Sequence, residues 1–229
     1  MNNGGVCHWL HFPVCVPLGL STKKKPAGLV NAQRPQGGIS GNGPHEMGYS
    51  KRCGTDSEDW IDCMTENSIA ADERAFLRRC VELAHEALEA GDEPFGSILV
   101  SADGDVLFED RNRVASGDNT QHPEFAIARW AAANLSPEER AVATAYTSGE
   151  HCPMCAAAHA WVGLGRIVYA SSSQQLLQWH RELGIPDGPV ASLPINAVAP
   201  GVPVAGPDPE LSGEVRELHA RSRQIRQEK

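Results

Sequence analysis

The 229-residue sequence predicts a three-layer α/β domain, in which a mixed sheet of about five strands lies between two layers of helices. Two observations predict this class. First, a segment with helical spacing of apolar residues, beginning near residue 70, is followed directly by a strand hairpin. Second, helical and strand patterns then alternate to the end of the chain. Crossovers between parallel strands are right-handed, so this alternation covers both faces of the sheet with helices.

The first helix is expected over residues 68–90, where apolar residues recur at spacings of three and four. Gly91 suits the end of this helix. The apolar run Gly96–Val100 then predicts a buried strand. The Asp-Gly pair at 103–104 is a hairpin turn signal, and a return strand is expected to begin at Val106.

The remaining elements are assigned from the same patterns, and their boundaries are less sharply marked. The later helices are expected at residues 122–134, 153–163, 173–183 and 208–227. The later strands are expected at residues 142–147 and 166–170, with one short strand at Ile195–Val198 inside a Pro-rich stretch.

Residues 1–63 differ in composition from the rest of the chain, because they contain ten Gly and five Pro and show no helical or strand period. Such a segment buries too little apolar surface to offset the entropy of ordering. We therefore expect residues 1–63 to be a mostly disordered extension and residues 64–229 to form the folded domain.

The apolar stretch Val6–Leu20 does not fit a secretory signal peptide, because two prolines interrupt it and the lysine cluster at 23–25 follows it. We expect a cytoplasmic protein. An organelle transit peptide is the other reading, since the first 45 residues contain no Asp or Glu. No run of 18 apolar residues exists, so no membrane span is expected.

The charge of the chain is concentrated in the predicted domain. Residues 64–229 hold 14 Lys and Arg against 24 Asp and Glu. Proteins that wrap nucleic acid backbones need clustered positive charge, so this balance makes a nucleic acid partner an unfavoured reading.

The segment Cys152-Pro153-Met154-Cys155 places two thiols at a spacing that brings both sulfurs together in the first turn of a helix. Pro153 suits the first helical position, so Cys152 becomes the N-cap. Backbone N–H groups at a helix start stabilise thiolates. A disulfide or a structural zinc knuckle is the competing reading, but a knuckle needs a second Cys pair, and Cys80 is the only other cysteine after residue 63.

The segment His122-Pro123-Glu124 repeats this arrangement, with His122 as the expected N-cap of a second helix. If the two helix starts pack together, one imidazole and two thiolates converge. Three such ligands suit Zn²⁺ and leave the fourth position for water, which is typical of a catalytic site. Glu124 is beside a ligand without being one, so it is the expected proton carrier.

His-x-Glu followed by Cys-x-x-Cys resembles the signature of the zinc-dependent cytidine/deoxycytidylate deaminase family. The resemblance implies a cytidine deaminase-like fold, one Zn²⁺ per chain held by His122, Cys152 and Cys155, and hydrolytic deamination with Glu124 as the catalytic residue. It also implies a homodimer and a small-molecule nucleobase or nucleoside as the substrate.

Within the family, the chain is most similar to guanine deaminases and tRNA adenosine deaminases. Pro94-Phe95-Gly96 resembles the entry strand of guanine deaminases, and Asn112 matches the family asparagine that hydrogen-bonds the base. An amide offers a donor and an acceptor to a ring edge. The resemblance therefore implies substrate contacts at Asn112, Phe95 and the aromatic Trp161, with a guanine-like ring favoured.

The chain also departs from the family pattern. Pro123 stands where Ala is usual, and His151 stands where Pro usually precedes the first Cys. The acidic pair of guanine deaminases is not evident after the strand at 166–170. Two other functions remain open: a tRNA adenosine deaminase, and a non-catalytic zinc-binding protein. His151 as a replacement metal ligand is a third open point.

Overall fold

The computed structural model describes residues 69–228, and the expected domain boundary at residues 63 and 64 lies outside them. The described part contains one five-stranded sheet with the strand order β2-β1-β3-β4-β5. Its strands are β1 (Gly96–Val100), β2 (Val106–Arg111), β3 (Thr144–Gly149), β4 (Ile167–Ser171) and β5 (Val204–Ala205).

The sheet is mixed, as the sequence predicts. β1 pairs antiparallel with β2 and with β3, whereas β3–β4 and β4–β5 are parallel pairs. β1, β3 and β4 are buried on both faces, except for the half-buried first residue of β3, and this is the burial expected of strands in the middle of a three-layer fold.

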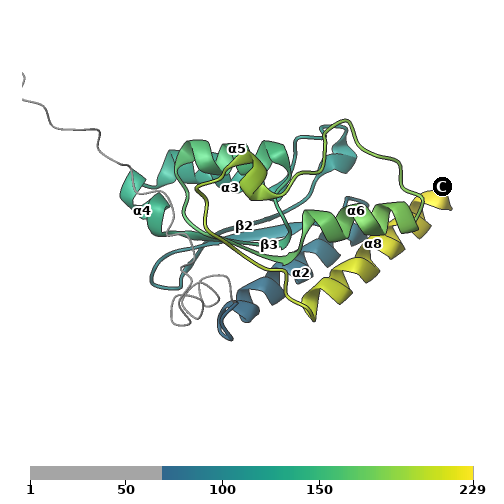
Figure 1. Cartoon of the computed structure of the whole chain (residues 1–229), viewed down its shortest axis with the longest axis horizontal. Helices are drawn as coiled ribbons and strands as arrows, with labels where there is room; N and C mark the ends of the chain where they lie inside the picture. Colours follow the sequence, from purple (N-terminus) through teal and green to yellow (C-terminus); the bar gives the residue numbers. More distant parts are fainter. Residues whose placement is uncertain (1–68, 229) are drawn as a thin grey trace, which may run out of the picture. The chain divides into compact units, whose positions relative to one another are not determined.

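Helices cover both faces of the sheet, and two separate apolar cores result (Figure 1). One face packs against α2 (Glu73–Glu89) and α8 (Leu211–Gln227), with α6 (Ser173–Glu182) beside α8. The other face packs against α3 (Pro123–Asn134) and α5 (Pro153–Val162), with α7 (Ile195–Val198) beside α5. The three-layer prediction is therefore confirmed.

The structure corrects the sequence-based elements in two places. Ile195–Val198, expected as a strand, is the short helix α7, and the last strand lies instead at Val204–Ala205. Residues 137–142 form a helix, α4 (Pro137–Val142), that the sequence patterns do not predict. Ser136 caps it through a reciprocal capping box with Glu139, so β3 begins two residues later than expected.

In residues 69–228, none of the helices is both long enough and apolar enough to cross a lipid bilayer. The cytoplasmic location expected from the sequence stays a prediction.

Gly96 marks the closest approach of a helix to the sheet. A Cβ atom at this position would lie 2.4 Å from the Cβ of Leu83, 2.5 Å from the carbonyl oxygen of Cys80 and 2.7 Å from the nitrogen of Ala84. Two of these three atoms belong to the α2 backbone, which cannot move aside as a flexible side chain would. A glycine is therefore needed where β1 enters the core.

We predict that Gly96→Ala lowers the free energy of unfolding by about 1–3 kcal/mol, the usual cost of overpacking a core. Chemical denaturation measures the change. Gly201→Ala is the matched control, because a Cβ there meets no atom within 4 Å. Equal stability of the two variants would contradict the tight α2–β1 contact.

Candidate metal centre and substrate pocket

Two helix N-termini meet at one end of the sheet. His122 is the N-cap of α3 and Cys152 is the N-cap of α5, and both adopt extended backbone angles before a proline at the first helical position. The prolines fix where the helices begin, since the ring sets φ and the missing N–H group needs no partner there. The packing of α3 against α5 then brings the two N-caps together.

The three predicted ligands converge at this point. The ligand atoms of His122, Cys152 and Cys155 all lie within 4.8 Å of one another. His122 Nδ1 is 3.6 Å from the sulfur of Cys152 and 3.6 Å from the sulfur of Cys155. One imidazole nitrogen and two sulfurs at these separations fit a tetrahedral Zn²⁺ site with its fourth position open.

The electrostatics of the two thiols also suit a cation. A hydrogen bond from Cys155 to Cys152 lowers the pKa of Cys152 to about 4 and raises the pKa of Cys155. The negative sulfur of Cys152 in turn raises the pKa of His122. Two adjacent thiolates repel each other, and a bound divalent cation would offset this repulsion, so that Cys155 could also lose its proton.

Glu124 lies in the first turn of α3, and its side chain is almost entirely buried. Its Oε1 lies 3.0 Å from the hydroxyl oxygens of Ser97 on β1 and Thr147 on β3. Its Oε2 is 3.7 Å from the sulfur of Cys155. The sheet thus anchors one carboxylate oxygen and leaves the other facing the metal ligands. Burial raises the pKa of Glu124, which makes it a better proton acceptor when ionised.

Asn112 is fully buried, and its amide is half satisfied. Its Oδ1 accepts the N–H of Val114 at 3.0 Å, and among the described residues its Nδ2 has no partner. The backbone N–H of Asn112 donates to the carbonyl of Phe95 at 2.9 Å, so the two predicted substrate contacts lie side by side. Because leaving a buried donor unpaired is costly, the free Nδ2 of Asn112 suits a ligand acceptor.

Trp161 lies apart from these residues. Its side chain is 89% exposed, and it follows Cys152 by nine positions on α5. At a rise of about 1.5 Å per residue this is about 13 Å along the helix. The exposed indole of Trp161 thus lies at the other end of α5 from the Cys152 N-cap, and the substrate contact expected there stays a prediction.

His151 and His159 form a buried pair behind the centre, with ring centroids 5.5 Å apart. His159 Nε2 contacts the carbonyl of Gly165 at 2.9 Å, which fits a core residue. Burial lowers the pKa of His151 well below its usual value, so His151 is neutral. In the described part of the chain, the ligand group contains His122 and not His151.

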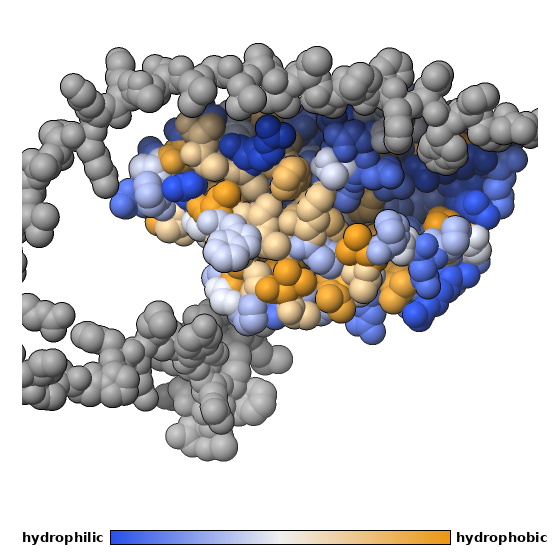
Figure 2. Space-filling model, turned by 90° about the horizontal axis from the view of Figure 1, so that it is seen from above, coloured by the Kyte–Doolittle hydropathy of each residue, from blue (hydrophilic) through white to orange (hydrophobic). Residues whose placement is uncertain are grey.

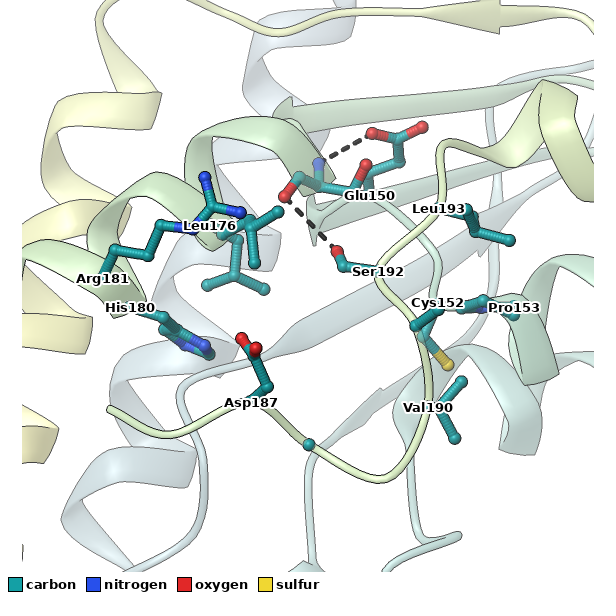
Figure 3. Close-up of a pocket in the computed structure, with 14 residues that line it drawn as sticks. Glu150, Cys152, Pro153, Leu176, His180, Arg181, Asp187, Val190, Ser192 and Leu193 are labelled. Carbon is teal, nitrogen blue, oxygen red and sulfur yellow. Dashed lines mark hydrogen bonds between the residues drawn. The ribbon is translucent and has the colours of Figure 1, made fainter. Parts of the chain in front are cut away.

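A pocket of about 520 Å³ adjoins the centre at Cys152. Three segments line it: the motif residues 150–153, one side of α6, and residues 185–194, which we call the pocket loop. Figure 3 shows Asp187 of the pocket loop and His180 of α6 pointing toward one another across this space. Burial lowers the pKa of His180, so the imidazole is a neutral donor and acceptor.

The sequence patterns do not point to Asp187, because the acidic residues expected of guanine deaminases come directly after β4, whereas α6 and its following turn separate Asp187 from that strand. A detectable signal is nevertheless present. The pocket loop contains Pro186, Pro189 and Pro194 around a single carboxylate, and short Pro-rich loops often carry binding residues on a rigid frame.

Comparison with known proteins agrees with this geometry. Residues 70–171 match the model of the cytidine and deoxycytidylate deaminase zinc-binding region. A probable cytosine deaminase of Schizosaccharomyces pombe is 31% identical over 121 residues, which cover 53% of this chain and 74% of the relative. Guanine deaminase of Bacillus subtilis is 39% identical over 98 residues, covering 42% of this chain and 62% of the relative.

A tRNA-specific adenosine deaminase of Agrobacterium fabrum is 33% identical over 102 residues, 44% of this chain and 66% of the relative. Among solved structures, a guanine deaminase from Nitrosomonas europaea aligns with a TM-score of 0.53 at 19% identity, covering 78% of this chain and 99% of the other. This last likeness supports the fold alone.

The matched segment contains both halves of the ligand group and the buried carboxylate between the sheet and the sulfurs. The chain belongs to the cytidine and deoxycytidylate deaminase family, and it is a zinc-binding enzyme of the hydrolytic deaminase class.

Proposed function

We propose that the protein hydrolyses the exocyclic amine of a free nucleobase, with a guanine-like ring as its preferred substrate, and releases ammonia. The observation that carries the ring preference is Asp187. Its carboxylate lines the pocket that opens at Cys152. Guanine presents an amine and a ring N–H side by side, and one carboxylate accepts from both.

When bound, Zn²⁺ supplies the Lewis acidity that makes water a nucleophile at neutral pH. In the overall reaction the oxygen of water bonds to the ring carbon, the C–N bond breaks and ammonia leaves. The buried carboxylate of Glu124 takes one proton from water and gives it to a ring nitrogen, and it then carries the second proton of the same oxygen to the departing amine. Its anchored Oε1 keeps the other oxygen directed toward the centre.

Three residues would hold the ring in position. Asn112 Nδ2 donates to a ring acceptor, and Asp187 accepts from the amine edge. The backbone of Phe95 adjoins Asn112, and its ring, which packs edge-on against His219 with the centroids 5.0 Å apart, would add an apolar wall. This arrangement orders the reacting carbon against the activated water, which is the main entropic gain of an enclosed site.

A tRNA adenosine deaminase is the second candidate, and the likeness to the Agrobacterium fabrum enzyme favours it. Charge argues against it. Residues 64–229 carry ten more acidic than basic residues, and the arginines of α8 at 216 and 226 are paired with Glu182 and Glu93. An RNA backbone needs unpaired positive charge along its path.

An ammonia-release assay over guanine, guanosine, adenine, cytosine, cytidine and a tRNA anticodon stem tests the proposal. We predict the highest kcat/KM on guanine. Asp187→Asn should lower kcat/KM on guanine by about 10²-fold, because the amide adds a donor where the base also donates, and should change cytosine turnover far less. Activity confined to the RNA stem would reverse the ranking of the two candidates.

For the proton carrier, we predict that Glu124→Gln retains about one zinc per chain and loses roughly 10²–10⁴ in kcat, the usual contribution of general acid–base catalysis. Metal content by atomic emission and steady-state rates measure the two effects. Unchanged turnover would remove Glu124 from the mechanism, and a zinc-free variant would show that it supports the metal site instead.

We further propose that the protein forms a homodimer through the outer faces of α3 and α5. Residues 153–162 of α5 include no Lys, Arg, Asp or Glu, and the α3 segment exposes one charge, Arg129. Helices facing solvent usually carry a charged stripe, so this face is unusual. Figure 2, seen from the α3–α5 side, shows a broad apolar area, and Trp161 is exposed on α5. A second copy would cover both.

We predict that Trp161→Glu converts the dimer to a monomer at micromolar concentration, because it places a charge in a desolvated aromatic contact. Light scattering after size-exclusion chromatography measures the mass. Val106→Glu, on the exposed edge strand β2, is the matched control and should leave the dimer intact. A monomeric wild-type protein would contradict the proposed interface.

A further inference from the structure

The pocket loop has few contacts of its own. Among residues 187–193, only Ser192 forms a hydrogen bond with another described residue. Its hydroxyl lies 3.5 Å from the carbonyl oxygen of Ser173. Most of these residues are exposed. The loop, α6 and Cys152 line the same pocket. A residue outside the loop must therefore fix the distance of the loop from α6 and from the metal ligands.

Glu150 supplies this link. Its Oε2 accepts the backbone N–H of Ser173, the first residue of α6, at 2.7 Å. Its Oε1 accepts the N–H of Ile195, the first residue of α7 directly after the pocket loop, at 2.8 Å. Figure 3 shows the carboxylate between the start of α6 and the pocket loop.

The backbone of Glu150 is fixed in turn by the sheet and the metal motif. Its N–H donates to the carbonyl of Ser171 at the end of β4, at 2.8 Å, and Cys152 follows two residues later. One residue thus joins the metal ligand, the end of a central strand, the start of α6 and the end of the pocket loop. Hydrogen bonds from N–H groups to a carboxylate are among the stronger ones in proteins.

We propose that Glu150 is a positioning residue, which holds α6 and the pocket loop at a fixed distance from the metal centre and so sets the affinity for the substrate. The expected effect on KM rests on the proposed function, whereas the expected loss of a hydrogen bond at Ser173 or Ile195 rests on geometry alone. The carboxylate of Glu150 bonds to backbone N–H groups of α6 and α7. Its effect should therefore fall on binding and not on the chemical step.

Glu150→Gln tests the inference with little change of shape. A glutamine amide has a single acceptor oxygen, so one of the two backbone N–H groups loses its partner. We expect the amides of Ser173 or Ile195 to exchange with solvent at least about tenfold faster, as resolved by NMR hydrogen exchange. Zinc content should stay at the wild-type value.

In the assay of the proposed function, we expect KM to rise about tenfold, the loss typical of one charge-assisted hydrogen bond, while kcat stays within about threefold. Glu138→Gln is the matched control, because it makes the same change at an exposed site on α4 and should alter neither measurement.

Two results would overturn the inference: unchanged exchange at both amides, or loss of zinc with a fall in kcat at constant KM. The second would place Glu150 in support of the metal site. Failure of the proposed function can be told apart from failure of this inference. If the wild-type protein is inactive on every base, the amide exchange of Glu150→Gln still tests the role of Glu150.

Discussion

The packing of α3 against α5 is the contact on which the site depends. Each helix begins at a proline that follows a metal ligand, so the position of the ligands is set by where the helices start and not by flexible loops. The sheet fixes the helices, because α3 packs on β1 and β2 while α5 packs on α3. A displacement of either helix start by one residue would separate the imidazole from the sulfurs.

Much of this arrangement follows from the sequence alone. Proline at the first helical position and the spacing of Cys152 and Cys155 are local signals, and they locate both N-caps correctly. The hairpin of β1 and β2 is similarly marked by its turn residues. What these signals share is that a few neighbouring residues determine the backbone.

The rest depends on packing between distant segments. The expected strand at Ile195–Val198 is a helix because four residues are too few to tell the two periods apart, and the preceding Pro194 suits a helix start as well as a strand edge. The type of residue suggests Trp161 as a pocket residue, although α5 directs it outward. The roles of Asp187 and Glu150 depend on where α6 and the pocket loop lie in the fold, which no local sequence pattern indicates.

The anchoring of Glu124 has a broader consequence. Ser97 and Thr147, which hold its carboxylate, belong to neighbouring central strands, whereas the pocket lining beyond residues 150–153 comes from α6 and a Pro-rich connection outside the sheet. One part of the proposed recognition surface, the pocket loop with Asp187, thus lies apart from the sheet that holds Glu124, whereas Asn112 and Phe95 stay attached to the ends of β2 and β1. Evolution, or a protein engineer, can exchange the recognition segment to admit a different heterocycle while the proton-transfer apparatus stays in its rigid frame.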